Sequence, residues 1–178
     1  MKLLTLLLAA VLVKSVLWMV TVPVFQTPDE QAHFAQLSYM AENKTLNIAW
    51  DKNLSLEIAT VEEILGTRRD GQGNNKFTYH PEYKNDSKIP NLPVETRTQY
   101  VDREAAGYPP LYYILDLPFY YAGYEGNVGY RVMLGRIISI ICHLGLVAVA
   151  YFIGKIIWED KIKSLTLAVM VGFQPMVS

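Results

Sequence analysis

The sequence predicts a mainly α-helical integral membrane protein with two complete transmembrane helices, a truncated third helix and a long extracytoplasmic first loop. Two observations carry this prediction. Hydrophobic residues make up 51% of the 178 residues, but they gather in two blocks rather than alternating with charges. Each block also contains an apolar run long enough to cross the hydrocarbon core of a bilayer, about 30 Å thick. A soluble domain would interleave apolar and charged residues at the period of a helix or a strand.

The first apolar run extends from Leu3 to Phe25, and we assign residues 1–25 to the first transmembrane helix. At about 1.5 Å of rise per residue, this run is long enough to span the membrane. A signal peptide is the alternative, but no small-residue cleavage site appears before the apolar run resumes at Val16. Lys14 falls near the centre of the run, where it either snorkels to the interface or faces other helices.

The second apolar run, Ile137 to Ile157, predicts a second transmembrane helix over residues 131–158. A third apolar segment, residues 165–178, has fourteen residues, which are too few to span a bilayer. We therefore expect residues 165–178 to be the start of a third transmembrane helix. The chain is then expected to be a truncated product or the N-terminal part of a longer protein.

Basic residues predict the orientation of these helices. Lys2 precedes the first span, and Lys155, Lys161 and Lys163 flank the turn that follows the second. The positive-inside rule places these lysines in the cytoplasm, so that residues 26–130 lie outside, facing away from the cytoplasm. That outer block carries nine basic and fifteen acidic side chains, a net charge of −6. Nucleic acid is therefore not expected as a partner, since phosphate binding needs clustered Lys and Arg.

Two helices are expected within the outer block. Thr27, Pro28 and Glu30 form a capping-box pattern, in which the Thr27 hydroxyl and the Glu30 carboxylate satisfy backbone N–H groups at a helix start. This pattern predicts an amphipathic helix over residues 28–42. Residues 110–124 are rich in tyrosine and predict an interfacial helix, because amphipathic rings settle where a membrane meets water.

Several motifs, taken in order along the chain, resemble the polytopic glycosyltransferases of the GT-C superfamily. They are Pro28-Asp29-Glu30 with His33, then Tyr108-Pro109-Pro110-Leu111-Tyr112, then Arg136, and finally Pro175-Met176 with Ser178. The sequence most closely resembles the bacterial membrane-protein family called domain of unknown function 2142. It is also similar to the protein O-mannosyltransferase and lipid A aminoarabinose transferase branches. The resemblance covers nearly the whole chain but only the N-terminal portion of such a protein.

The resemblance implies transfer of a sugar from a polyprenyl-phosphate donor to an extracytoplasmic hydroxyl on a cell-envelope polysaccharide, lipid or protein. An acid in the first outer loop is the usual catalytic carboxylate of these enzymes. Asp29 is therefore expected to act as the base, with Glu30 and His33 supporting it. In the absence of later spans, the fragment alone is expected to be inactive.

Each of these three residues also has a purely structural interpretation. Asp29 complements the positive end of a helix dipole, and Glu30 completes the capping box. His33 lies four residues after Asp29 and shares its helix face. His33 is thus expected to orient the carboxylate, to bind donor phosphate, to join Asp29 in holding a divalent cation such as Mg²⁺ or Mn²⁺, or simply to pack.

Three further residues are candidates for substrate binding. Arg131 and Arg136 precede the second span, where they either pair with a lipid phosphate or anchor the helix at the interface. Tyr108 either contacts substrate or fixes the point at which the loop returns to the membrane. Two other classes of function remain open from the sequence. The first is a non-catalytic membrane-anchored module whose outer loop binds another protein. The second is an accessory subunit of a transporter.

Overall fold

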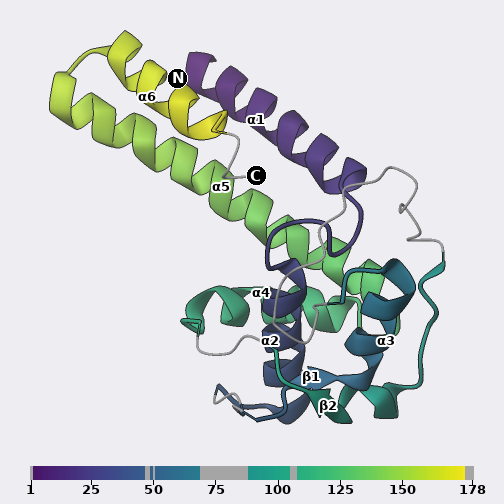
Figure 1. The fold of residues 1–178 in the computed structure, drawn as a ribbon. Helices are drawn as coiled ribbons and strands as arrows, with labels where there is room; N and C mark the ends of the chain where they lie inside the picture. Colours follow the sequence, from purple (N-terminus) through teal and green to yellow (C-terminus); the bar gives the residue numbers. More distant parts are fainter. Residues whose placement is uncertain (1, 47–48, 50, 69–87, 105–107, 175–178) are drawn as a thin grey trace. The chain divides into compact units, whose positions relative to one another are not determined.

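The computed structural model describes residues 2–46, 49, 51–68, 88–104 and 108–174, and these residues are mainly helical, as predicted (Figure 1). The chain divides into two compact units. The membrane unit comprises Met1–Thr21 and Arg136–Ser178. The loop unit comprises Val22–Gly135.

The membrane unit contains α1 (Lys2–Thr21), most of α5 (Val128–Trp158) and α6 (Lys161–Gly172). Within the described residues, α1 and α5 are the helices long and apolar enough to cross a membrane, in agreement with the two predicted spans. The 12-residue α6 begins at an Asp160 cap, where the carboxylate accepts hydrogen bonds from the Ile162 and Lys163 backbone N–H groups. Within the predicted third helix over 165–178, the structure has α6 ending at Gly172, and residues 175–178 lie outside the described ranges.

The first helix is shorter than the sequence predicts, because α1 ends at Thr21 rather than Phe25. Pro23 lacks a backbone N–H and disfavours helical conformation in the residue before it, so the helix stops just ahead of it. Val24 and Phe25 then turn into the loop unit, where their side chains are 1% and 0% exposed. The apolar end of the predicted span therefore belongs to the core of the loop unit.

Apolar side chains from all three helices pack together in the membrane unit. The cluster consists of Leu7 and Val11 from α1, Val147 from α5 and Ala168 from α6. Gly172 permits close approach, since a Cβ atom there would lie 2.7 Å from Cγ2 of Val11. Small residues at helix crossings commonly serve this purpose within membranes.

Two basic side chains of the membrane unit bind carbonyl groups at helix C-termini. Lys14 Nζ donates to the Gly172 carbonyl in the last turn of α6, at 3.2 Å. Arg136 Nη1 donates to the Met19 carbonyl in the last turn of α1, at 2.9 Å. Both bonds satisfy carbonyls that lack helical partners, and both place positive charge at the negative end of a helix dipole. Lys14 therefore faces another helix, which is one of the two alternatives that the sequence left open.

In its described residues, the loop unit contains four α-helical segments, one 3₁₀ helix and a short pair of strands. The helices are α2 (Glu30–Asn43), α3 (Leu56–Leu65) and α4 (Leu111–Ala122), with the N-terminal turns of α5 as the fourth. The strands β1 (Leu54–Ser55) and β2 (Tyr100–Asp102) pair antiparallel, and Leu54 lies opposite Asp102. The 3₁₀ helix η3 (Val94–Arg97) precedes β2.

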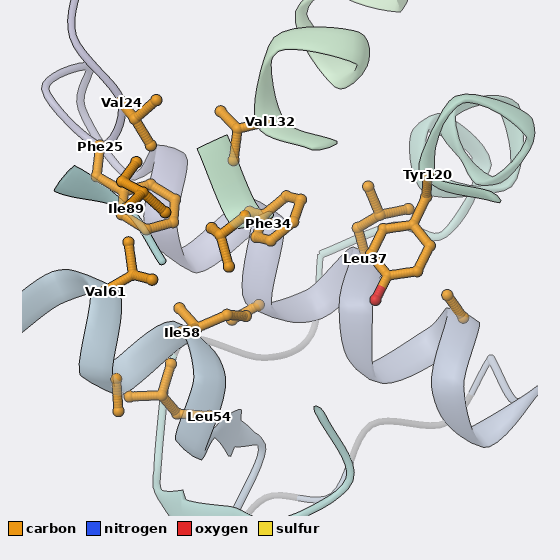
Figure 2. Close-up of a cluster of buried hydrophobic side chains, with 14 of the residues drawn as sticks. Val24, Phe25, Phe34, Leu37, Leu54, Ile58, Val61, Ile89, Tyr120 and Val132 are labelled. Atoms are coloured by element: carbon orange, nitrogen blue, oxygen red, sulfur yellow. The ribbon is translucent and has the colours of Figure 1, made fainter. Parts of the chain in front are cut away.

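The core of the loop unit surrounds α2 (Figure 2). Phe34 and Leu37 of α2 pack with Ile58 of α3 and Tyr120 of α4. The prediction of an amphipathic helix over 28–42 understates this burial, because the polar residues Gln31, Gln36 and Ser38 of α2 are also buried. The helix is enclosed by α3, α4 and β1 instead of exposing a broad polar face.

Two of the five tyrosines in the predicted interfacial helix are buried instead of lying at an interface. Tyr113 and Tyr120 are 2% and 0% exposed and lie in the core of the loop unit, so their rings are not available to a membrane interface. Asp116 lies on the same buried face of α4. Burial raises the pKa of the Asp116 carboxyl from 3.8 to about 6. A Cβ atom at Gly135 of α5 would approach Asp116 Oδ2 to 3.0 Å, which explains the glycine.

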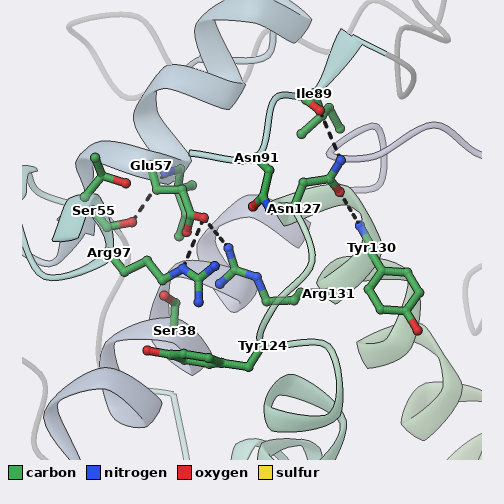
Figure 3. Close-up of polar contacts among 12 residues, drawn as sticks. Ser38, Ser55, Glu57, Ile89, Asn91, Arg97, Tyr124, Asn127, Tyr130 and Arg131 are labelled. Atoms are coloured by element: carbon green, nitrogen blue, oxygen red, sulfur yellow. Dashed lines mark hydrogen bonds and ion pairs between the residues drawn. The ribbon is translucent and has the colours of Figure 1, made fainter. Parts of the chain in front are cut away.

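A cluster of buried charges joins α3, η3 and α5 (Figure 3). Glu57 Oε1 accepts hydrogen bonds from Arg97 Nε, at 3.3 Å, and from Arg131 Nη2. All three side chains are at most 1% exposed. Arg131 Nη1 also donates to the Tyr120 hydroxyl at 2.8 Å, and that hydroxyl donates to Glu42 Oε1 at 2.6 Å. We call Glu57, Arg97 and Arg131 the buried charge cluster.

This cluster corrects the prediction for Arg131. The sequence suggested an exposed residue that binds a lipid phosphate or anchors a helix at the interface, but the side chain is fully enclosed and paired with Glu57. The first turns of α5 belong to the loop unit. Arg131 therefore holds the loop unit together from within.

The buried charge cluster predicts that replacing Glu57 costs more stability than replacing Glu63, another glutamate of α3. Glu57→Gln should destabilise the protein by about 3–5 kcal/mol, because it removes the carboxylate that two buried guanidinium groups share. Glu63, whose side chain is 62% exposed, pairs with Arg68 at the surface. Glu63→Gln should therefore cost roughly 0–1 kcal/mol. Thermal unfolding of both variants in detergent measures the difference, and equal unfolding temperatures would show that the cluster does not stabilise the loop unit.

Candidate functional site

The candidate site begins at the turn that leads into α2. Asp29 occupies the N-cap position, with a left-handed φ of 58°, and α2 starts at Glu30. The predicted capping box is wrong, because it placed Thr27 at the N-cap and Pro28 in the helix. The Glu30 Oε2 atom instead accepts a hydrogen bond from the Phe25 backbone N–H at 2.7 Å. Glu30 thus closes the turn between α1 and α2.

This turn sets the position of the Asp29 carboxylate. Aspartate is one of the few residues with a side chain that adopts left-handed backbone conformation readily. The Asp29 carbonyl accepts a hydrogen bond from the His33 N–H at 2.9 Å, which is the first helical turn of α2. The half-buried Asp29 side chain therefore lies at the positive end of the helix dipole, where a carboxylate is stabilised.

The His33 ring is held by two tyrosines that are far away in the sequence. His33 Nδ1 and the Tyr113 hydroxyl are hydrogen-bonded at 2.7 Å. The Tyr108 ring packs against the imidazole, with 4.6 Å between ring centroids and 42° between ring planes. Gln36 Nε2 donates to the Tyr108 carbonyl at 3.0 Å and so fixes the backbone of Tyr108. The imidazole, a phenol hydroxyl and an aromatic ring thus meet beside the start of α2.

Burial decides the charge state of this group. Desolvation lowers the pKa of His33 below its ordinary value of 6.5, although Asp29 and Glu30 oppose this shift by favouring the positively charged form. Desolvation also raises the pKa of the Tyr113 hydroxyl, and the nearby Tyr108 and Tyr112 add to that increase. Near neutral pH, His33 is therefore a neutral imidazole and Tyr113 a protonated phenol.

The structure groups four of the six predicted site residues and separates the other two. Asp29, Glu30, His33 and Tyr108 belong to this part of the loop unit. Arg131 lies in the buried charge cluster of that unit, and Arg136 in the membrane unit binds the Met19 carbonyl.

Tyr113 is a residue of this site that the sequence analysis missed. The signal was present, since Tyr113, Asp116 and Tyr120 recur at helical spacing, and these are the buried residues of α4. The tyrosines suggested a membrane interface, but Tyr113 and Tyr120 face protein.

The described residues do not form a set of metal ligands. Across those ranges, no group of three or more His, Cys, Asp or Glu side chains is placed to hold a metal ion. Asp29 and His33 alone are too few ligands for Mg²⁺ or Mn²⁺, which need oxygen-rich coordination.

The fold and the site define a mainly helical membrane protein with two candidate spans and a folded unit between them. A model of the family described as predicted membrane protein (DUF2142) matches residues 12–177. This match covers most of the chain, so the protein belongs to that family. No curated protein and no solved structure matches the chain.

The lowered pKa of His33 predicts how stability depends on pH. Below pH 6.5, the unfolded chain binds a proton at His33 before the folded chain does. Stability from this residue is therefore complete above about pH 6.5 and is lost as the pH falls toward the lower folded-state pKa. NMR titration of isotope-labelled histidine in detergent should give a His33 pKa below 6.5. His33→Gln identifies the signal and should flatten the dependence of stability on pH in that window, whereas an unshifted titration would contradict the burial described for this ring.

Proposed function

We propose that this chain supplies the first spans and the first outer loop of a GT-C-type glycosyltransferase. The enzyme transfers a sugar from a polyprenyl-phosphate donor to a hydroxyl on an extracytoplasmic glycan, lipid or protein. One observation carries the proposal. The N-terminus of α2 bears the Asp29 carboxylate at its N-cap and a His33 imidazole that contacts both Tyr108 and Tyr113. A carboxylate base, a neutral hydrogen-bonding ring and an aromatic face suit a sugar-phosphate site.

The proposed reaction is an inverting displacement with Asp29 as general base. Asp29 takes the proton of the acceptor hydroxyl while the hydroxyl oxygen bonds to the anomeric carbon of the donor sugar. The bond from that carbon to the phosphate oxygen breaks, and the polyprenyl phosphate leaves with the bonding electron pair. The acceptor attacks from the face opposite the phosphate, so the configuration at the anomeric carbon inverts.

The other site residues have supporting roles in this proposal. Glu30 holds the turn that positions Asp29, through its bond to the Phe25 N–H. Tyr108 is 36% exposed and offers a ring against which the flat face of a sugar stacks. Arg136 belongs to the membrane unit, where it donates to the Met19 carbonyl, and it is not part of the proposed site. Arg131 contributes only through the fold of the loop unit.

Replacement of the proposed base is the direct test. Asp29→Asn keeps the size of the side chain but removes its ability to accept a proton. The assay adds a panel of polyprenyl-phosphate sugars, each carrying a radiolabelled hexose, to membranes that contain the full-length protein. Asp29→Asn should lower transfer to endogenous acceptors by at least about 10²-fold. The control is Asp51→Asn, at an exposed acid of the same loop, which should keep full activity.

Two outcomes would overturn the proposal. A fully active Asp29→Asn variant would remove Asp29 from the chemistry. Absence of transfer by the unaltered protein from every donor in the panel would contradict the transferase. A non-catalytic binding module or a transporter subunit would then be favoured.

We also propose that the loop unit lies outside the cell membrane and that the N-terminus lies in the cytoplasm. The basic residues around α1, α5 and α6 support this orientation through the positive-inside rule. Single cysteines at Lys44 in the loop unit and at Lys161 at the start of α6 test it, because both positions are exposed.

The labelling experiment needs Cys142→Ala as its background, since Cys142 is the natural cysteine of the chain. An impermeant thiol reagent added to intact cells should label Lys44→Cys at once. Lys161→Cys should label only after permeabilisation. The reverse pattern would invert the orientation.

A further inference from the structure

We propose that Tyr113 is a positioning residue that holds His33 in the tautomer with its proton on Nε2. His33 then serves the candidate site as a neutral hydrogen-bond donor, and not as a base or a metal ligand. The consequence for catalysis rests on the proposed transferase function. The tautomer itself follows from the geometry of the loop unit alone.

The contact between the two side chains is short and partly buried. Tyr113 Oη lies 2.7 Å from His33 Nδ1, a distance typical of a strong O–H···N hydrogen bond. Tyr113 is 2% exposed and His33 is half-buried, so most of the surroundings of this bond are protein. The two residues come from α2 and α4, which pack along each other through the core of the loop unit. The bond is therefore a fixed tertiary contact between helices.

The direction of the bond follows from counting donors and acceptors. A neutral imidazole has one N–H donor and one bare nitrogen, while a phenol has one O–H donor and an acceptor oxygen. If Nδ1 donated to Tyr113, the buried phenol would need another acceptor for its own proton. Among the described residues, His33 Nδ1 is the hydrogen-bond partner found for this hydroxyl. An unsatisfied buried O–H is costly, so Tyr113 donates and Nδ1 accepts.

This direction fixes the chemistry of the other ring nitrogen. With Nδ1 bare, the proton of the neutral ring resides on Nε2. An N–H group at Nε2 donates to an anionic oxygen, such as a donor phosphate oxygen or a carboxylate. It neither accepts a proton nor ligates a metal. Of the roles that the sequence left open for His33, hydrogen bonding to phosphate or to Asp29 and simple packing remain, and shared metal ligation does not.

The orientation of the ring is fixed from a second side. The Tyr108 ring packs on the imidazole at 4.6 Å, and a hydrogen bond from Gln36 fixes the Tyr108 carbonyl. Rotation of the imidazole by a half-turn would break the bond to Tyr113 while keeping this stacking. Tyr113 is thus the residue that distinguishes the two ring orientations.

Nitrogen NMR of the full chain in detergent, with isotope-labelled histidine, tests the tautomer. The chain has three histidines, and His33→Gln identifies the signals of His33. The unaltered protein should show a protonated Nε2 and a bare Nδ1 near neutral pH. Tyr113→Phe should give a mixture of the two tautomers. Tyr130→Phe is the matched control, since Tyr130 is 54% exposed, and it should leave the His33 signals unchanged.

Each outcome decides the proposal. A proton on Nδ1 in the unaltered protein overturns it, and this result does not depend on whether Tyr113→Phe folds. A single Nε2–H tautomer that persists in folded Tyr113→Phe overturns the role of Tyr113. Added Mn²⁺ should leave the His33 signals in place, and selective broadening of those signals would overturn the exclusion of metal ligation.

A transfer assay on the full-length protein separates this inference from the proposed function. Tyr113→Phe should lower kcat by about tenfold with little change in KM, the effect of one misplaced hydrogen bond. Unchanged kcat alongside the expected NMR change would overturn the catalytic consequence. The absence of any transfer by the unaltered protein, together with the expected NMR result, would remove the transferase function and leave the tautomer intact.

Discussion

The loop unit depends on one buried carboxylate, that of Glu57. Its Oε1 atom receives hydrogen bonds from guanidinium groups of η3 and α5, which are 40 and 74 residues away along the chain. Charges this deeply buried lose their hydration, and only close pairing compensates for that loss. In the described part of this unit, a single two-stranded sheet provides the backbone hydrogen bonds between strands. The two hydrogen bonds to Glu57 connect η3 and α5 to α3.

The buried charge cluster is connected to the candidate site through the tyrosines of α4. Arg131 binds the Tyr120 hydroxyl, which also meets Ser38 of α2 at 3.2 Å. Two turns earlier on α4, Tyr113 binds His33 of α2. The same pair of helices is therefore joined by phenol hydrogen bonds at both places. The cluster orders α2 and α4, and this order positions the polar groups at the start of α2.

Much of the helical framework was predictable from the sequence, but the details of the site were not. Apolar runs revealed α1 and α5, because length and hydropathy suffice for that purpose. Pro23 indicated the end of α1, but the apolar Val24 and Phe25 extended the predicted span beyond it. Glu57 and Arg97 carried no local signal, since only the tertiary fold brings them together. Tyr113 and Tyr120 were expected at a membrane surface, because an aromatic helix face has the same pattern whether lipid or protein covers it.

The central claim is that the start of α2 and its tyrosine partners form a site for a polyprenyl-phosphate sugar. Photocrosslinking tests it most directly, with a polyprenyl-phosphate hexose that carries a photoreactive group on the sugar and membranes containing the full-length protein. The claim predicts that mass spectrometry will locate the crosslink between residues 27 and 36 or between 108 and 113, and that excess unmodified donor will abolish it. Crosslinks confined to α1, α5 and α6, or crosslinks that unmodified donor does not displace, would contradict it.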